Sequence, residues 1–145
     1  DFNRTWDEYV HGFGNKHGEY WLGLQNIYDI LQTSENFELS IMVTTVPNWF
    51  QGYYRGFSLS NFTDNFKYHS DVFKGNSVYP LGDSLTNGSY SIEGRPFSTY
   101  DRDYSNNNCP DRFKGGWWYL DAPECSRANP NGRRNDSNDE STVQW

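Results

Sequence analysis

Residues 101–125 bring together the side chains best suited to binding chemistry: paired aspartates, an asparagine run, both cysteines and three adjacent aromatic rings. Asp101 and Asp103 stand in Asp-x-Asp spacing, and asparagines follow at residues 106–108. Alternating aspartates in a loop can direct two carboxylates at a Ca²⁺ ion while intervening carbonyls complete a shell of about 6–8 oxygens. The segment therefore predicts a calcium-binding loop, with a turn held by aspartate and asparagine side chains alone as the alternative.

Cys109 and Cys125 are the only cysteines of the protein. They predict a disulfide in an oxidising compartment, with a buried pair of free thiols as the alternative. Two cysteines cannot form a four-thiolate zinc site. Asn-x-Ser/Thr sequences are acceptors for N-glycosylation and favour a secreted, extracellular protein. Four of them are predicted glycosylation sites, and they begin at Asn3, Asn61, Asn87 and Asn135.

The composition predicts one folded domain and excludes two classes of partner. Aromatic residues make up 19% of the 145 residues, whereas disordered proteins are poor in aromatics. A net charge of −7 argues against nucleic acid, because phosphate binding requires a basic face. The sequence holds no apolar run of the roughly 18 residues that indicate a transmembrane helix, so we expect no membrane span.

The first part of the sequence has helical periodicity. Thr5 and Glu8 have capping-box spacing, which predicts a helix that begins between them. Its apolar stripe would consist of Trp6, Tyr9, Val10 and Phe13. A second helix is predicted over residues 19–31, with an apolar face made of Trp21, Leu24, Ile27, Tyr28 and Leu31. Core packing is the expected role of both stripes.

From residue 37 the apolar period changes from 3.6 to 2, which is typical of strands. Residues 37–46 predict a half-buried strand, and residues 53–60 and 65–73 predict further strands on either side of a turn. Strands this close in sequence pair antiparallel, so the fold class is α+β. We expect one domain over residues 1–145. Its helices and antiparallel sheet would occupy about residues 1–80, and a loop-rich binding part would occupy about residues 81–145.

The loop-rich part is dominated by Gly, Asn, Asp, Ser and Pro. Because it also holds the cysteines and the aromatic run, we expect an ordered, functional loop region. Residues 129–142 look mobile.

Several short stretches together resemble fibrinogen C-terminal-like domains. In order along the sequence they read TWDEYVHGFGN, EYWLGLQNIY, GDSL, FSTYDRD, NC, GGWWY, C and NPNG. The resemblance implies an extracellular α+β recognition domain of the kind found in fibrinogen, ficolins, tachylectin-like lectins and angiopoietin-type ligands. It also implies an incomplete domain, because the family has a subdomain before Trp6 and a last strand after Trp145.

The resemblance implies calcium ligands in the aspartate-rich loop. Asp103 matches the leading ligand of the family, with Asp101 beside it. Ser105 stands where the family has its next aspartate, and carbonyls of Ser105 and Asn107 would complete the site. The stretch from Asp101 to Cys109 is about two residues shorter than in many members, and one carboxylate is missing.

The resemblance also implies a ligand pocket supported by the disulfide. A cis peptide bond would precede Cys125, the ring of Tyr119 would line an apolar wall, and the N–H groups of Cys125 and Ser126 would hold an acetyl oxygen. Three features depart from the family: residues 120–124 form a longer connection, Ser126 replaces a common histidine, and the aromatics expected after Asn131 are absent.

Two functions remain open. One is a secreted lectin-like module that binds acetylated or other glycans on cell surfaces with calcium support, in recognition of the innate-immune type. The other is a protein-binding adhesive, structural or receptor-ligand domain. Single weak sites act through several copies, so we expect a homo-oligomer formed by segments outside this sequence. We expect no enzyme: the Gly-Asp-Ser-Leu stretch at residues 82–85 also occurs in lipases, but no histidine follows it.

Overall fold

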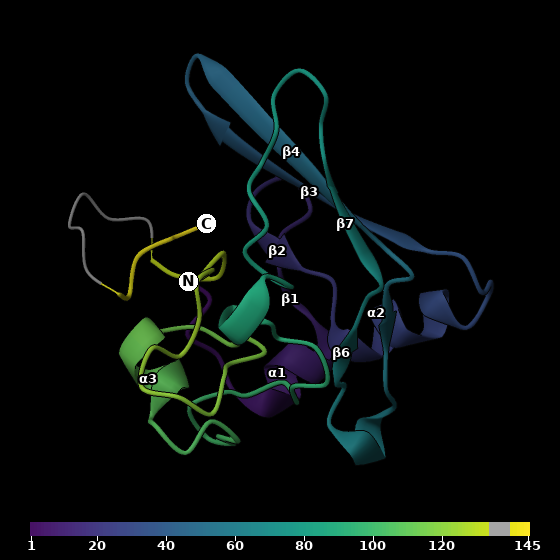
Figure 1. The fold of residues 1–145 in the computed structure, drawn as a ribbon. Helices are drawn as coiled ribbons and strands as arrows, with labels where there is room; N and C mark the ends of the chain where they lie inside the picture. Colours follow the sequence, from purple (N-terminus) through teal and green to yellow (C-terminus); the bar gives the residue numbers. More distant parts are fainter. Residues whose placement is uncertain (134–139) are drawn as a thin grey trace.

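A computed structural model gives the fold, and it describes residues 1–133 and 140–145 (Figure 1). Helix α1 (Trp6–His11) begins with the predicted capping box: Thr5 N–H donates to Glu8 Oε2 at 2.9 Å, and Glu8 N–H donates to Thr5 Oγ1 at 3.3 Å. These two bonds satisfy amide groups at the helix start that have no partner within the helix. The helix ends at Gly12.

The second helix is shorter than predicted. Helix α2 (Leu24–Leu31) lacks the first five residues of the predicted span 19–31, because two of them form strand β2 (Tyr20–Trp21). Strand β2 pairs antiparallel with β1 (Phe13–Gly14). Gly23 separates strand from helix with a φ of 101°, and a Cβ there would lie 2.8 Å from the backbone of His11. Trp21, the first apolar residue of the predicted helical face, therefore belongs to a strand.

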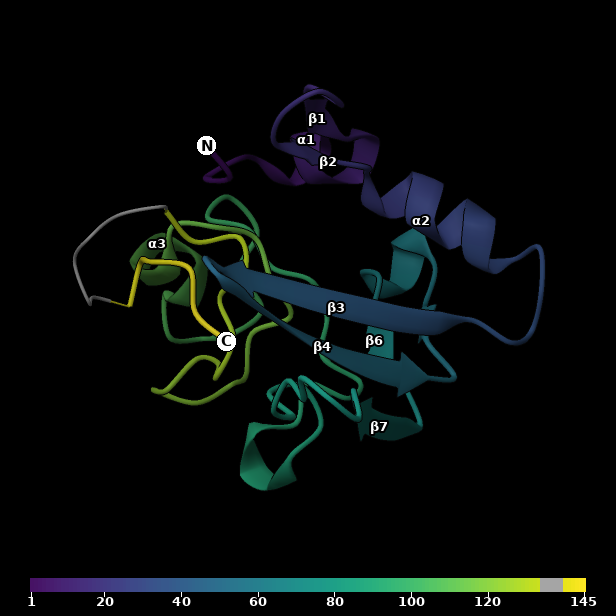
Figure 2. The same cartoon turned by 90° about the horizontal axis from the view of Figure 1, so that it is seen from above.

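The main sheet is antiparallel with the order β3-β4-β7. Its strands are β3 (Glu38–Thr45), β4 (Asn48–Arg55) and β7 (Val72–Gly75). Half-buried and exposed side chains alternate along most of β3, which confirms the predicted period of 2. In Figure 2, α2 lies along one side of the β3–β4 pair, and Figure 1 shows α1 and α3 in the part of the molecule that lies away from the turn of that hairpin.

The other predicted strands are broken into short pieces. Strand β5 (Ser58–Leu59) pairs only with β6 (Tyr68–His69), and a 3₁₀ turn, η1 (Phe62–Asp64), lies between them. Gly56 interrupts the predicted strand 53–60 with a φ of 65°. A Cβ at Gly56 would collide with the carboxylate of Asp71, so the backbone can turn there only with glycine.

The second half of the protein has the predicted loop character. Within the described residues after β7 it holds one α-helix, α3 (Cys109–Phe113), and one 3₁₀ turn, η2 (Gly88–Tyr90). The prediction of mobility for residues 129–142 is wrong for Asn129 and Thr142, which are buried and hydrogen-bonded. The stretch 134–139 lies outside the described residues.

The core is built mainly from aromatic rings. Its largest fully buried side chains include Tyr9, Tyr54, Phe66, Tyr68, Phe97 and Tyr119. Trp117 and Trp118 are each 5% exposed, and Trp118 Nε1 donates to the carbonyl of Phe66 at 2.7 Å. Both indole rings therefore pack in the core. No helix of the described part is long and apolar enough to cross a membrane.

Candidate functional site

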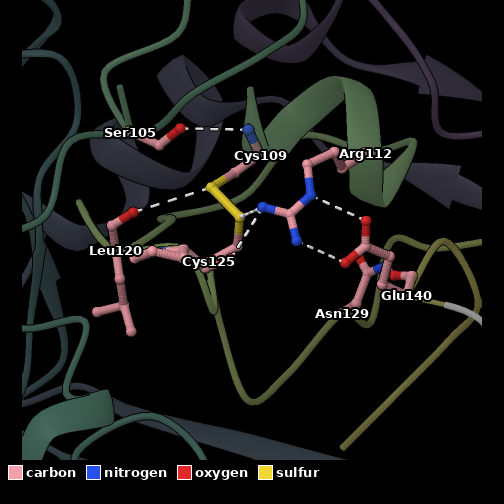
Figure 3. Close-up of polar contacts among 8 residues, drawn as sticks. Ser105, Cys109, Arg112, Leu120, Cys125, Asn129 and Glu140 are labelled. Carbon is pink, nitrogen blue, oxygen red and sulfur yellow. Dashed lines mark hydrogen bonds and ion pairs between the residues drawn. A yellow bond between two sulfur atoms is a disulfide. The ribbon is translucent and has the colours of Figure 1, made fainter. Parts of the chain in front are cut away.

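The predicted disulfide joins Cys109 and Cys125, whose Cα atoms are 5.5 Å apart (Figure 3). Cys109 is the first residue of α3, and Cys125 lies in the loop that follows the aromatic run. Both residues are fully buried. The bond therefore fixes the start of α3 against residues 120–126, and this is the region in which the sequence placed a ligand pocket.

Arg112 ties the disulfide loop to the C-terminal segment. Its Nε and Nη2 donate to the two carboxylate oxygens of Glu140 at 2.9 and 2.6 Å, which raises the pKa of the guanidinium (Figure 3). Its Nη1 donates to the carbonyl of Pro123 at 2.9 Å and lies 3.3 Å from Cys125 Sγ. One planar cation thus connects three stretches of the polypeptide, a geometry that suits arginine.

Two buried asparagines connect the end of α3 and the residues after it to the C-terminal segment by hydrogen bonds. Asn129 Nδ2 donates to the carbonyls of Phe113 and Thr142 at 3.0 and 3.1 Å. Asn131 Nδ2 donates to the carbonyl of Gly116 at 2.8 Å. Sequence reasoning assigned no role to Arg112 or Asn129, because their partners lie 11 to 28 residues away and leave no local pattern.

The structure places the predicted pocket residues away from the surface. Tyr119 is fully buried, its hydroxyl donates to the carbonyl of Gly115 at 2.8 Å, and burial raises the pKa of the phenol. A ring in this position packs in the core in this conformation, and ligand contact by Tyr119 stays a prediction.

The two predicted N–H donors are engaged within their own turn. Cys125 N–H donates to the carbonyl of Ala122 at 2.9 Å, and Ser126 N–H donates to that of Glu124 at 2.6 Å. The predicted cis bond before Cys125 is also wrong: among the described residues the cis peptide is Val46–Pro47, and Cys125 has a φ of 61° instead. Ligand binding by Cys125 and Ser126 stays a prediction, and it would require this turn to open.

The two predicted calcium-binding carboxylates already accept hydrogen bonds from the protein. Asp101 Oδ1 accepts hydrogen bonds from the backbone N–H of Trp6 at 2.9 Å and from the hydroxyl of Thr99 at 2.7 Å. Asp103 Oδ1 accepts from the N–H of Ser105 at 2.7 Å. The first aspartate therefore caps the start of α1, whereas the second stabilises its own turn.

One of the two predicted carbonyl ligands already accepts a hydrogen bond. The carbonyl of Ser105 accepts from Asn107 Nδ2 at 2.8 Å, and the Ser105 side chain is fully buried. No group of three or more His, Cys, Asp or Glu residues that could hold a metal occurs within residues 1–133 and 140–145. The residues present do not fit a preformed Ca²⁺ shell, and calcium binding at Asp101, Asp103, Ser105 and Asn107 stays a prediction.

The predicted glycosylation sites differ in access. Asn61 and Asn87 are exposed, whereas Asn3 is half-buried. At the first of these, the hydroxyl of Thr63 donates to Asn61 Oδ1 at 2.8 Å. Asn135 lies outside the described residues. Glycosylation at all four stays a prediction.

The Gly-Asp-Ser-Leu stretch leads into a bend that hydrogen bonds to Asp83 organise. Asp83 Oδ1 accepts hydrogen bonds from the N–H of Thr86 at 2.9 Å and from the hydroxyl of Tyr54 at 3.1 Å. The pKa of Tyr54 is raised by burial and then by the charge of Asp83. Ser84 is buried. Asp83 therefore organises the bend and satisfies a buried tyrosine.

A different part of the molecule presents apolar side chains to solvent. We name it the hairpin-tip surface, and it consists of Val46, Trp49, Val78 and Tyr79. The two valines are 95% and 68% exposed, and the rings of Trp49 and Tyr79 contact each other with centroids 4.9 Å apart. In Figure 1 the β3–β4 hairpin and the loop after β7 project together, away from α1.

The loop of the hairpin-tip surface is held against β4. Gln51 N–H donates to the carbonyl of Tyr79, and the carbonyl of Gln51 accepts from the N–H groups of Asn76 and Leu81, all within 2.9–3.0 Å. Asn76 Oδ1 also accepts from the N–H of Tyr79 at 3.1 Å. The exposed rings therefore stand on a fixed backbone. No charged residue occurs in residues 44–49 or 76–82.

Comparison with known proteins gives consistent matches. The family model "Fibrinogen beta and gamma chains, C-terminal globular domain" matches residues 1–145. The protein is 37% identical over 147 residues to Tenascin-R of Gallus gallus, which covers 100% of this chain and 10% of that protein. It is 38% identical over 136 residues to Ficolin-3 of Homo sapiens, which covers 92% of this chain and 42% of that protein.

Solved structures agree with the sequence matches. The fibrinogen-like globe domain of human ANGPTL2 matches with a TM-score of 0.83 and 34% identity, over 100% of this chain and 65% of that chain. The corresponding domain of human ANGPTL6 has the same TM-score at 32% identity, over 99% of this chain and 63% of that chain. The sequence described here spans a tenth of the length of the tenascin relative.

Proposed function

We propose, from the premise that this protein belongs to the family of C-terminal globular domains of fibrinogen beta and gamma chains, that it is a non-enzymatic extracellular recognition module that binds a protein partner. The disulfide between Cys109 and Cys125 supports an oxidising, extracellular setting. The whole protein would present several copies of the domain through segments outside this sequence, because single sites of this kind bind weakly.

One observation carries the choice of a protein over an acetylated glycan. The N–H groups of Cys125 and Ser126 already donate to carbonyls of their own turn, and the ring of Tyr119 lies in the core. An acetamido group needs an apolar wall and free donors, and releasing buried backbone donors has an energetic cost of about 1–3 kcal/mol each. This arrangement does not favour acetyl recognition.

The hairpin-tip surface has the properties expected of a protein contact. Tryptophan and tyrosine are enriched among the residues that dominate protein–protein binding energy, and the centres of such interfaces are depleted of charge. Trp49 and Tyr79 are residues of these types, and the segments that carry them, 44–49 and 76–82, hold no charged residue. The hydrogen bonds of Gln51 hold the loop that carries Tyr79 against β4, the strand that carries Trp49, before binding. A partner would offer an uncharged, apolar hollow to the projecting hairpin.

A glycan-binding function is the second candidate. The match to Ficolin-3 over 92% of this chain is the observation in its favour. Binding of an acetylated sugar would require the turn at residues 122–126 to open, because Ser126 N–H is otherwise used. Calcium would belong to this second candidate as support for the neighbouring loop.

The two candidates are separated by binding to intact cells of the source organism. We expect labelled full-length protein to lose binding after surface proteolysis and to keep it after enzymatic deglycosylation or with N-acetylglucosamine as competitor. Trp49→Ala and Tyr79→Ala should each weaken binding at least tenfold. Met42→Ala is the matched control, because Met42 is an exposed apolar residue of the same hairpin. Elution from N-acetylglucosamine resin by acetate, with full binding by the Trp49 variant, would replace this proposal with the lectin function.

A further inference from the structure

We infer that residues 101–109, here named the aspartate loop, are held in shape by their own side chains and by Asp121, so that the order of this loop does not depend on a bound calcium ion. The inference concerns the loop itself and does not rest on the proposed function. It follows from the hydrogen bonds that five side chains of the loop make.

Ser105 occupies the centre of the loop. Its side chain is fully buried, and its hydroxyl oxygen accepts hydrogen bonds from the N–H groups of Asn107 and Cys109, both at 3.3 Å. Cys109 is the first residue of α3, where backbone N–H groups lack partners within the helix. A serine hydroxyl directed outward at a metal could not make these bonds. Ser105 therefore supplies an internal acceptor at the position where the family resemblance implies a carbonyl ligand.

The asparagine run explains how so short a loop can close. Asn106 and Asn108 both have left-handed backbone conformations, with φ of 59° and 58°. Asparagine accepts this conformation more readily than most residues other than glycine. The residue between them uses its side chain on the loop: Asn107 Nδ2 donates to the carbonyl of Ser105 at 2.8 Å. The run thus provides both the turns and a donor.

Asp121 connects the loop to the other side of the disulfide. Asn106 Nδ2 donates to Asp121 Oδ2 at 3.1 Å, and Asn107 Nδ2 lies 3.5 Å from Asp121 Oδ1. Asp121 lies in the connection at residues 120–124, which is longer than the resemblance leads one to expect. The longer connection thus supplies a carboxylate that accepts a hydrogen bond from Asn106 of the shortened loop. In this way the longer connection reaches the shorter loop and stabilises it.

The start of the loop is anchored separately. Asp101 Oδ1 binds the first N–H of α1 and the hydroxyl of Thr99, and Asp103 Oδ1 binds the N–H of Ser105. Anions at the start of a helix are stabilised by unpaired N–H groups and by the helix dipole. A calcium ion that used these carboxylates would compete with bonds already made, and it would gain no third carboxylate from this loop.

The first test is thermal unfolding and amide hydrogen exchange of the disulfide-bonded full-length protein in millimolar CaCl₂ and in EDTA. We expect unfolding temperatures of this domain that agree within about 1 °C, and protection of the Cys109 amide that is the same in both buffers. Calorimetric titration with CaCl₂ should give no saturable heat at this loop. A saturable calcium heat, together with a rise in unfolding temperature that Asp103→Asn abolishes, would overturn the inference.

The second test asks whether the side-chain contacts carry the order. Ser105→Ala removes the buried acceptor and should lower the unfolding temperature by about 2–5 °C in both buffers. Asp121→Asn should lower it by about 1–3 °C and increase exchange at residues 106–109. Glu35→Gln is the control, because it removes one negative charge at an exposed position outside the loop. If Asp121→Asn and Ser105→Ala behave like the control, the loop is held by something else and the inference fails.

Discussion

Arg112 and Glu140 form a two-point ion pair across 28 residues of sequence, with guanidinium–carboxylate distances of 2.9 and 2.6 Å. The pair lies beside the disulfide: the third guanidinium nitrogen, Nη1, donates to the carbonyl of Pro123 and lies 3.3 Å from Cys125 Sγ. Arg112 thereby links α3 to Pro123 and Glu140, in addition to the link that the disulfide provides.

Replacement of Arg112 by lysine should separate geometry from charge. Lysine keeps the positive charge but cannot make two parallel bonds to Glu140 and a third to Pro123. Because both side chains are partly exposed, we expect a loss of only about 0.5–1.5 kcal/mol in unfolding free energy. Urea unfolding of Arg112→Lys, Glu140→Gln and the double variant measures the coupling. Strictly additive losses would mean that the pair contributes nothing beyond its separate contacts.

A methyl group at Gly116 should destabilise the core. A Cβ there would lie 2.7 Å from carbons of the Tyr9 and Phe97 rings, and Gly116 N–H donates to the hydroxyl of Tyr9 at 2.9 Å. Overpacking of a closed core costs about 1–3 kcal/mol, so Gly116→Ala should lower the unfolding temperature by several degrees. Gly82→Ala is the matched control, since a Cβ at Gly82 would meet nothing within 4 Å. Equal unfolding temperatures for the two variants would contradict the described packing.

Local patterns predicted the parts of this fold that local contacts determine. The capping box at Thr5 depends on a residue three positions away, and the alternation along β3 depends on the strand's own pleat. The pattern before α2 misled because Trp21 packs on the core from a strand: its Nε1 donates to the carbonyl of Tyr9 at 2.9 Å. A single half-buried side chain such as that of Trp21 therefore fits a helical pattern although its residue lies in a strand.

The candidate site was less predictable because its contacts join residues that no local spacing rule connects. The disulfide followed from there being two cysteines, and the family resemblance indicated its neighbourhood. Whether Tyr119 faced solvent or core depended on the Phe113 ring, 5.5 Å away, and on the carbonyl of Gly115, neither of which is visible in a run of three aromatics. Asp121 and Arg112 act through partners that no spacing rule connects to them.

The capping box should make stability depend on acidic pH. The pKa of Glu8 is lowered, mainly because its carboxylate accepts the backbone N–H of Thr5, with further help from the Thr5 hydroxyl and Arg4. A lowered folded-state pKa contributes stability above the ordinary glutamate pKa of about 4.3, and that contribution is lost as pH falls through the lowered value.

Glu8→Gln tests this linkage. At neutral pH the variant should unfold about 1–3 °C below wild type, since the side chain is partly exposed and the cap contributes at the low end of its usual range. The difference should shrink below about pH 4 and vanish near pH ~2, where the wild-type carboxylate is also neutral. Unfolding temperatures measured every half unit of pH, with Glu35→Gln as the control for loss of one charge, decide it. A difference that persists at the acid end would assign the effect to something other than ionisation.

Loss of the disulfide should destabilise the loop-rich half more than the sheet. Cys109 and Cys125 are 16 residues apart, and a cross-link that closes a loop of about 15 residues stabilises by about 3 kcal/mol in the entropic account of cross-linking. In the double variant Cys109→Ser, Cys125→Ser, the hydrogen bond from the residue 109 N–H to Ser105 Oγ and the bond from Arg112 Nη1 to the Pro123 carbonyl can still form. We therefore expect part of the structure around residues 105–126 to survive. Hydrogen exchange should then rise first at residues 105–126, while amides of the β3–β4 pair keep their protection. Uniform loss of protection would show instead that the two halves unfold as one cooperative unit, because the ring contacts of Trp118 with Tyr68 and Phe97 couple them more strongly than the cross-link separates them.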